Sequence, residues 1–311
     1  MMSEEERSKG GIMPSRVRGA ITRLPKAREA YEWVRGLLDS ESINQQLQVS
    51  LLAQYRAQFR AGVPPFESIS DAGFRCYSEF EEDGILLYAL AAIGMKTRRV
   101  VEIGCGTGAV NMSTNLILNH GYKGYLFDGS SSNINAADIF YRSKKDCHLI
   151  RPELRQSWIT RDNVNEVLAA AGASGEVDVF SLDIDGNDWH IWQAIDVIQP
   201  RICVFETNDI IPGDLSLTVP YVADFNYTDL PVGQQDFRSV SLKAMSRLSA
   251  SKGYRLIGSH RHGFNVFFMR EDLAGDLFPE VSISDIHDNP WTLQGQSTRW
   301  PEVRDMGWQE V

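Results

Sequence analysis

The sequence lacks the features that mark several large classes of protein. Its four cysteines, Cys76, Cys105, Cys147 and Cys203, form no C-x-x-C pair, which is typical of reduced, buried thiols rather than of a disulfide framework. The longest apolar run, residues 84–94, is too short to cross a bilayer. The opening Met-Met-Ser-Glu-Glu-Glu has no apolar segment of a secretory signal. We therefore expect a cytoplasmic protein without a membrane partner.

Positive charge is also in short supply. The chain has 31 Lys and Arg against 41 Asp and Glu, a net charge of −10, which argues against nucleic acid as the main partner. Its 311 residues are 43% hydrophobic and 23% charged, ordinary values for a globular protein. This length can bury a large core, so we expect one α/β domain with extensions.

A β-branched run followed by alternating glycines organises the chain. Residues 99–103 suit a buried strand. Gly104, Gly106 and Gly108 then allow a tight turn and a close approach of the backbone to a ligand. A helix pattern over residues 109–120 follows at once, so its first N–H groups should face whatever lies over the loop.

The next predicted strand, residues 125–127, ends on Asp128, and a carboxylate there can accept the hydroxyl hydrogen bonds of a ribose. The glycine spacing is not the G-x-G-x-x-G of dinucleotide-binding proteins. With Glu102 in front, it resembles motif I of the class I S-adenosylmethionine-dependent methyltransferases, in which the loop wraps the amino-acid end of the cofactor and the later acid holds the ribose. The resemblance implies cofactor contacts from Glu102, Gly104, Cys105, Gly106, Gly108, Asp128, Gly129 and Asp183. The alternative is a glycine-rich turn of some other α/β protein.

Strand and helix patterns alternate through the middle of the chain. Strands are expected at residues 99–103, 125–127, 147–150, 177–183, 202–206, 254–257 and 264–268. Helices are expected between them at residues 109–120, 132–141, 161–171, 187–198 and 239–252. The last two strands are too close in sequence for a helical crossover, so they must form an antiparallel hairpin. The prediction is an α/β doubly wound, Rossmann-like sheet of seven strands with the last antiparallel, as the methyltransferase family shows.

The flanking segments suggest three regions. Residues 1–70 are predicted to be an N-terminal helical extension, with a loosely ordered start at 1–25 and helices at 26–38 and 42–61. Residues 71–270 form the methyltransferase-like domain. Within it, residues 207–238 lack periodicity, and a loop that long is usually functional, so we expect a substrate insert or lid. In the tail, residues 271–311, the isolated tryptophans are expected to staple the tail to the domain.

Polar side chains gather where the fourth and fifth strands end. Asp183 and Asp185 follow one strand, and Glu206 and Asn208 follow the next. Like charges at close range must be hydrogen-bonded, protonated or neutralised by a cation. Such oxygen ligands suit Mg²⁺ or Mn²⁺, although a plain turn with Asp188 capping the next helix is the structural alternative.

Here the resemblance becomes more specific. Asp183, Glu206 and Asn208 look like the metal ligands of divalent-cation-dependent O-methyltransferases. Residues 71–270 resemble the FkbM-type branch through Glu-Glu-Asp-Gly-Ile at 81–85, the glycine loop, residues 181–186 and Gly-Phe-Asn at 263–265. The chain departs from that branch in reading Asp-Ile-Asp-Gly after the fourth strand, where Asp-x-Glu-Gly is frequent, and this leaves metal dependence open.

The resemblance implies S-adenosylmethionine as cofactor and transfer of its methyl group to a hydroxyl of a small molecule, a sugar or natural-product intermediate. Removing the hydroxyl proton needs a base, and Asp185 and His190 are the candidates; His260 and His262 are outside ones. Two alternatives stay open: an N-methyltransferase of the same fold without metal, and a non-catalytic cofactor-binding or assembly protein. A homo-oligomer is also left open.

Overall fold

The computed structural model describes residues 40–311 and the side chains from residue 44 onward. The predictions for residues 1–25 and 26–38 lie outside the described residues. Contacts divide the chain into two units, residues 1–50 and 51–311, and the whole sheet belongs to the second. Among residues 40–311, no helix has both the length and the apolar character that a membrane span requires.

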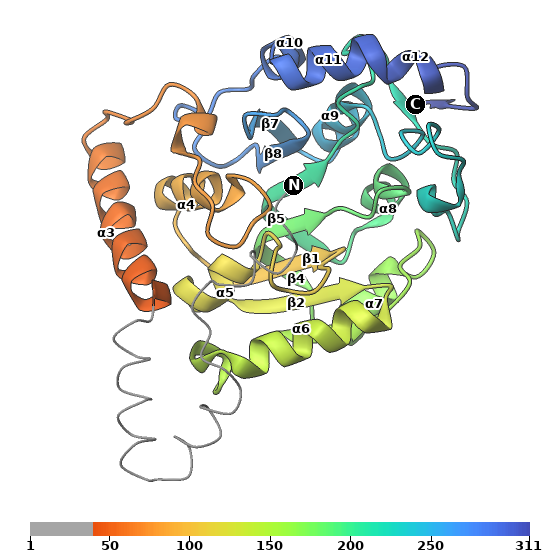
Figure 1. Cartoon of the computed structure of the whole chain (residues 1–311). Coiled ribbons are helices and arrows are strands. Elements are labelled where there is room, and N and C mark those ends of the chain that lie inside the picture. The colour runs from red at the N-terminus through yellow and green to blue at the C-terminus, as the bar shows by residue number, and fades with distance from the viewer. Residues whose placement is uncertain (1–39) are drawn as a thin grey trace, which may run out of the picture. The chain divides into compact units, whose positions relative to one another are not determined.

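A seven-stranded sheet forms the centre of the second unit, in the order β3-β2-β1-β4-β5-β8-β7 (Figure 1). The strands are β1 Arg99–Ile103, β2 Lys123–Asp128, β3 Glu153–Gln156, β4 Gly175–Leu182, β5 Ile198–Glu206, β7 Tyr254–Ser259 and β8 Asn265–Arg270. β1 to β5 are parallel to their neighbours, and β8 is antiparallel to both β5 and β7. The predicted α/β sheet with a terminal antiparallel strand is confirmed, and that strand is inserted second from the edge rather than at it.

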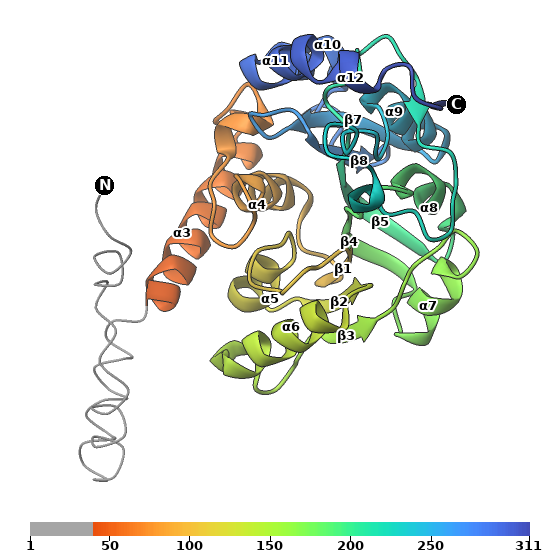
Figure 2. The same cartoon turned by 45° about the vertical axis from the view of Figure 1, so that its right-hand side comes forward.

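Helices cover both faces of the sheet (Figure 2). The first layer contains α4 Glu82–Ile93, α5 Thr114–His120 and α6 Ser131–Ser143, and the second contains α7 Val164–Ala170, α8 Asp188–Ala194 and α9 Leu242–Ser251. Each layer has its own apolar core, and β1 feeds both because neighbouring residues of a strand point to opposite faces. Val100 therefore packs in the first core and Val101 in the second. The carboxyl ends of the parallel strands are left for ligands.

The third strand was predicted in the wrong place. Residues 147–150 are not a strand, because η3 Lys145–Cys147 is a 3-10 turn and the side chains of Leu149 and Ile150 are 97% and 63% exposed. β3 instead begins at Glu153, three residues after the predicted strand ends, and among the described strands it pairs with β2 alone. As an edge strand it needs no apolar run, so its polar sequence, Glu-Leu-Arg-Gln, gave no strand signal.

The helix after the glycine loop starts later than predicted. The pattern over residues 109–120 becomes a helix only at α5 Thr114–His120. The buried carboxylate of Glu102 accepts hydrogen bonds from the N–H groups of Met112 and Ser113, at 3.0 and 3.1 Å. Those N–H groups point into the protein rather than at a ligand, so the expectation that the helix N-terminus faces the ligand is wrong for this chain.

The remaining predicted elements differ mainly at their ends. The helix expected at 187–198 ends at Ala194, because β5 begins at Ile198 and runs through Pro200. The helix expected at 42–61 is α3 Ser40–Arg60. Residues 51–60 of α3 belong to the second unit. In this part of the helix, the ring of Tyr55 packs on that of Tyr88 of α4, with ring centroids 5.1 Å apart.

The insert and the tail form one small substructure. β6 Leu217–Thr218 of the insert pairs with β9 Gln309–Glu310 of the tail. Their shared core consists of Ile210, Ile211, Val219, Phe237 and Val303, with Trp300 and Trp308 packed against it. The insert also contains η4 Tyr227–Asp229, and the tail contains the helices α10 Ile283–His287, α11 Pro290–Thr298 and α12 Trp300–Val303. Two of the three tail tryptophans thus join the tail to the insert.

Candidate functional site

The three glycines of the loop after β1 meet different surroundings. All have positive φ angles, 90° at Gly104, 53° at Gly106 and 73° at Gly108. A Cβ atom at Gly104 would lie 1.7 Å from the carbonyl oxygen of Asp183, and one at Gly108 would lie 2.9 Å from the ring of Tyr141. A Cβ at Gly106 would meet nothing within 4 Å. Packing therefore requires Gly104 and Gly108, and Gly106 alone faces open space in which a ligand could lie.

Asp128, the predicted ribose acid, holds the same loop. Its Oδ2 accepts a hydrogen bond from the N–H of Gly106 at 2.9 Å, and its Oδ1 accepts from the N–H of Ser130 at 2.8 Å and from the Asn133 side chain at 3.1 Å. A carboxylate has about four acceptor positions. Three are used, so Asp128 can accept one further hydrogen bond rather than the two that both ribose hydroxyls would offer.

The side chains of two other predicted cofactor residues, Glu102 and Cys105, are not available to contact a ligand directly. Burial raises the pKa of Glu102 to about 7, and its oxygens are bonded to the backbone before α5 and to the Ser113 hydroxyl. The Cys105 thiol is buried in the first core, where burial raises its pKa, so only the backbone of this residue can reach a ligand.

A tryptophan that the sequence did not single out stands over Gly129. A Cβ at Gly129 would lie 2.7 Å from Cε3 of Trp158. The ring is 52% exposed, and its Nε1 donates a hydrogen bond to the carbonyl of Ala223 in the insert at 2.7 Å. A half-exposed ring beside the predicted ribose acid offers a flat apolar surface. A single tryptophan in a segment without helix or strand periodicity does not by itself indicate a ligand contact, so the sequence did not predict a role for Trp158.

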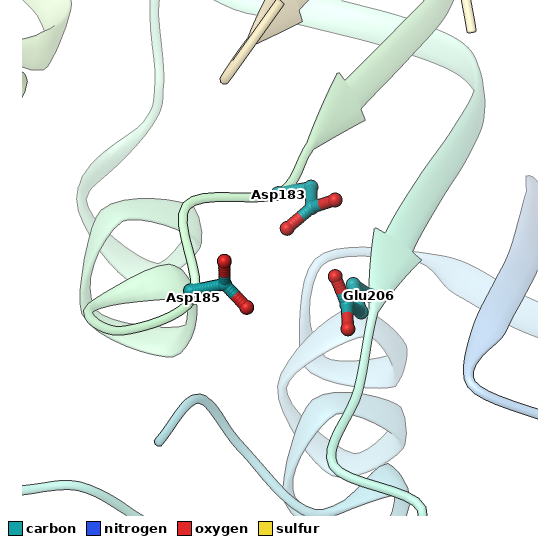
Figure 3. A group of neighbouring side chains, drawn as sticks. All are labelled: Asp183, Asp185 and Glu206. Carbon is teal, nitrogen blue, oxygen red and sulfur yellow. The ribbon is translucent and has the colours of Figure 1, made fainter. Parts of the chain in front are cut away.

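The acids at the ends of β4 and β5 converge as predicted. Asp183 directly follows β4, Asp185 lies in the loop before α8, and Glu206 ends β5; Figure 3 shows the three side chains pointing toward one another. One oxygen from each lies within 4.8 Å of the others. Burial and then mutual repulsion raise the pKa of Asp183, and burial raises the pKa of Glu206. The two carboxyl groups are hydrogen-bonded to each other, so they share a proton.

An arginine from the insert balances part of this charge. Arg238 pairs with Asp185, its Nη2 lies 3.9 Å from Oε1 of Glu206, and its guanidinium lies 4.8 Å from the ring centroid of Tyr227. Burial nevertheless raises the pKa of Asp185, while Arg238 opposes that shift. We call Asp183, Asp185, Glu206 and Arg238 the acidic cluster. Arg238 was missed because nothing local marks an arginine 53 residues away as the partner of Asp185.

Asn208, the third predicted metal ligand, is used by the insert. Its Nδ2 donates hydrogen bonds to the carbonyls of Asp236 and Arg238, at 2.8 and 3.0 Å. Only its Oδ1 is left for a cation. The oxygen ligands of the cluster are chemically suited to Mg²⁺ or Mn²⁺, but Arg238 and the shared proton already neutralise part of their charge.

His190, the second candidate base, lies away from the cluster. It is 3% exposed, and its Nε2 lies 2.9 Å from the carbonyl of Val219 in the insert. Burial lowers its pKa, so the ring is neutral at pH 7. Asp188 accepts hydrogen bonds from the N–H groups of Ile184 and Gly186, both at 2.9 Å, so it holds the turn before α8. The expectation that Asp188 caps the helix is wrong, because Asp188 is the first residue of α8 and the N-cap is Asn187, which makes no side-chain capping hydrogen bond.

A cavity of about 70 Å³ lies between the glycine loop and the acidic cluster. It is lined by Glu79, Glu102, Gly104, Val110, Asn111, Met112, Ser181, Asp183, Val204, Glu206 and Asn265. Glu79 and Asn265 were not predicted for the site. They come from the loop before α4 and from the start of β8, which only the folded sheet brings beside β5.

No family model matches the chain, and no curated protein matches it. Solved structures resemble it weakly. The N-terminal domain of EvdMO1 with SAH bound has a TM-score of 0.39 at 12% identity, covering 61% of this chain and 81% of that one. Magnesium protoporphyrin IX methyltransferase from Synechocystis PCC 6803, solved with bound SAM, has a TM-score of 0.37 at 13% identity, covering 61% and 77%. Monomeric WbdD has a TM-score of 0.33 at 17% identity, covering 56% of this chain and 36% of WbdD. With TM-scores this low, these likenesses carry no conclusion about the chain.

Proposed function

We propose that the chain is an S-adenosylmethionine-dependent methyltransferase of the cytoplasm, acting on a hydroxyl of a small molecule such as a sugar or natural-product intermediate. One observation carries the proposal. The open corner at Gly106 and the spare acceptor of Asp128 lie at the carboxyl ends of β1 and β2, and the buried acids lie at the ends of β4 and β5. Ligands of doubly wound sheets bind beyond these strand ends.

The β1 and β2 ends suit the cofactor. Gly106 leaves room for a ligand close to the backbone, Asp128 can accept one ribose hydrogen bond, and Trp158 offers a face on which an adenine can stack. S-adenosylmethionine, when bound, supplies an activated methyl group. The residues of the chain then have to bind the acceptor, orient its oxygen and take up its proton.

The acidic cluster suits the proton transfer. Asp185 remains the candidate base, because burial raises the pKa of its carboxyl group toward the range in which a base works at neutral pH. Arg238 keeps the insert against these acids and limits their exposure to water. Divalent-metal assistance through Asp183 and Glu206 is an alternative proposal, in which a metal would bind the hydroxyl and lower its pKa.

Calorimetric titration with S-adenosylhomocysteine tests the cofactor site. Asp128→Ala should weaken binding by about 1.5–3 kcal/mol, the range for a hydrogen bond to a charged group. Asp146→Ala, which removes an exposed carboxylate elsewhere, should titrate like the parent. Thermal unfolding of both variants separates lost binding from lost fold. A parent protein that takes up no S-adenosylhomocysteine would contradict the proposal.

Removal of divalent ions tests separately whether a metal assists methyl transfer. If a divalent ion takes part, EDTA should stop turnover, and added Mg²⁺ or Mn²⁺ should restore it in the parent but not in Asp183→Asn. Full turnover after removal of bound ions would leave Asp185 as an unaided base.

A further inference from the structure

The cavity beside the acidic cluster is walled by hydrogen-bond acceptors. Four of its lining residues carry carboxyl groups: Glu79, Glu102, Asp183 and Glu206. Among the described residues that line it, none is lysine, arginine or histidine. The amide nitrogen of Asn111 is already spent on the carbonyl of Cys105, at 3.2 Å. An anionic group would be repelled by such a wall, and a group with several donors and a positive charge would be bound.

Asn265 supplies a separate sign that the cavity is built for a ligand. Its Nδ2 donates to Oε1 of the buried Glu82 at 2.8 Å, which fixes the orientation of the amide. The opposite atom, Oδ1, has no hydrogen-bond partner among the described residues, although the residue is only 3% exposed. An unpaired buried carbonyl is costly. Because Asn265 lines the cavity, a donor bound there can supply the missing hydrogen bond.

The strand register places Asn265 next to the acids. Asn265 of β8 lies directly opposite Glu206 of β5, and residues opposite each other on antiparallel strands have Cβ atoms about 5 Å apart. Asp183 shares its hydrogen bond with Glu206. Two carboxyl groups and one amide oxygen therefore surround one end of the cavity, while Val110, Met112 and Val204 give it apolar walls.

We propose that this cavity is the subsite for a primary ammonium group on the acceptor molecule. An ammonium has three donors and no acceptor, which matches the carboxyl groups of Asp183 and Glu206 and the Oδ1 of Asn265. The apolar walls match the carbon chain that carries it. The inference rests on the proposed function, because the bound molecule is a methyl acceptor only if the chain is a methyltransferase. It narrows the substrate class to small molecules that carry both an amine and the hydroxyl to be methylated.

A metal ion fits this space less well than an ammonium. Asp185, which would be the third carboxylate of a metal site, is paired with Arg238 and does not line the cavity. The amine of the cofactor is the competing occupant, because Glu102 and Gly104 also line the cavity. Glu206 and Asn265 mark its far end, since they lie on strands two and three places from β1, about 10 and 14 Å away at the usual strand spacing.

Ethanolamine and ethylene glycol form a matched pair of probes, because they differ only in ammonium against hydroxyl. Saturation-transfer NMR on the full chain should show contact for ethanolamine and much less for ethylene glycol. Glu206→Gln should weaken the ethanolamine signal at least fivefold. Val204→Leu, which fills the cavity without changing charge, should do the same. Glu166→Gln, which removes an exposed carboxylate of α7, should bind like the parent.

Three results would overturn the proposal. The two probes could bind equally, Glu206→Gln and Val204→Leu could both leave ethanolamine binding unchanged while remaining folded, or Mg²⁺ could displace ethanolamine at equal concentration. A matching loss of S-adenosylhomocysteine affinity in Glu206→Gln would instead assign the cavity to the cofactor amine, and this also contradicts the proposal.

The same protein distinguishes the two proposals. A parent that binds ethanolamine but no S-adenosylhomocysteine would contradict the methyltransferase function and support an ammonium subsite of another enzyme or binding protein. A parent that binds S-adenosylhomocysteine but not ethanolamine would leave the methyltransferase function standing and remove the subsite.

Discussion

The ends of β1 and β2 and the ends of β4 and β5 are held together by different forces. At the first, backbone conformation decides: Gly104 fits a contact that no side chain permits, and Asp128 holds the N–H of Gly106. At the second, charge decides: Asp185 is balanced by Arg238, which arrives from the insert. The first pair of strand ends is therefore held by backbone geometry, whereas the second depends on a charged side chain from the insert.

The largest effect on stability is expected from alanine substitutions in the glycine loop, which test whether backbone geometry holds the ends of β1 and β2. Gly104→Ala has to push a Cβ into the carbonyl of Asp183 at a φ of 90°, and should cost about 3–5 kcal/mol of unfolding free energy. Gly106→Ala has open space and only its positive φ to accommodate, so about 1–2 kcal/mol is expected. Urea unfolding measures both, and equal losses would show that packing does not distinguish the two glycines.

The unfolding free energy measured over a series of pH values should show an effect of intermediate size, which arises from Glu102 of β1. Burial raises the pKa of Glu102 from its ordinary 4.5 to about 7, so the folded state favours the protonated carboxyl. Its contribution to stability is greatest below pH 4.5 and is lost as the pH rises to 7, by on the order of 3 kcal/mol. Glu102→Gln should flatten the fall in unfolding free energy between pH 5 and 7.

Ser113→Ala is the matched variant for that experiment. The Ser113 hydroxyl donates to Glu102 and lowers its pKa, so its removal should extend the fall in stability to higher pH. An unchanged pH profile in both variants would show that Glu102 does not titrate in this range.

The smallest effect is expected at His190. Its ring bonds the carbonyl of Val219 and is neutral at pH 7. His190→Gln should therefore lower the unfolding free energy by about 1 kcal/mol and leave the rate of methyl transfer within twofold. A large loss of rate with stability intact would instead make His190 a base, and would move the chemistry away from the β4 and β5 ends.

Much of the fold could be predicted because its signals are local. The buried strands are runs of apolar, β-branched residues, and the short link between the last two strands forces a hairpin. β3 was misplaced because an edge strand carries no apolar signal, and the start of α5 was misplaced because Glu102 captures N–H groups ten and eleven residues away. Long-range hydrogen bonds of this kind leave no periodicity in a sequence.

The site divides in the same way. The convergence of Asp183, Asp185 and Glu206 was predicted, because these residues follow or end two successive parallel strands whose carboxyl ends lie at the same edge of the sheet. The groups that decide their chemistry, Arg238 from the insert and Asn265 from β8, come from segments that tertiary packing alone places there. For the same reason Asn208 was given the role of a ligand, although its amide nitrogen is bonded to the backbone of the insert.

The close approach of Gly104 to the carbonyl of Asp183 joins the two sets of strand ends mechanically. Neither backbone can shift at this point without moving the other, because no side chain lies between them to absorb the motion. Occupation of the loop should therefore change the affinity at the acids, and occupation at the acids must change the affinity of the loop by the same factor.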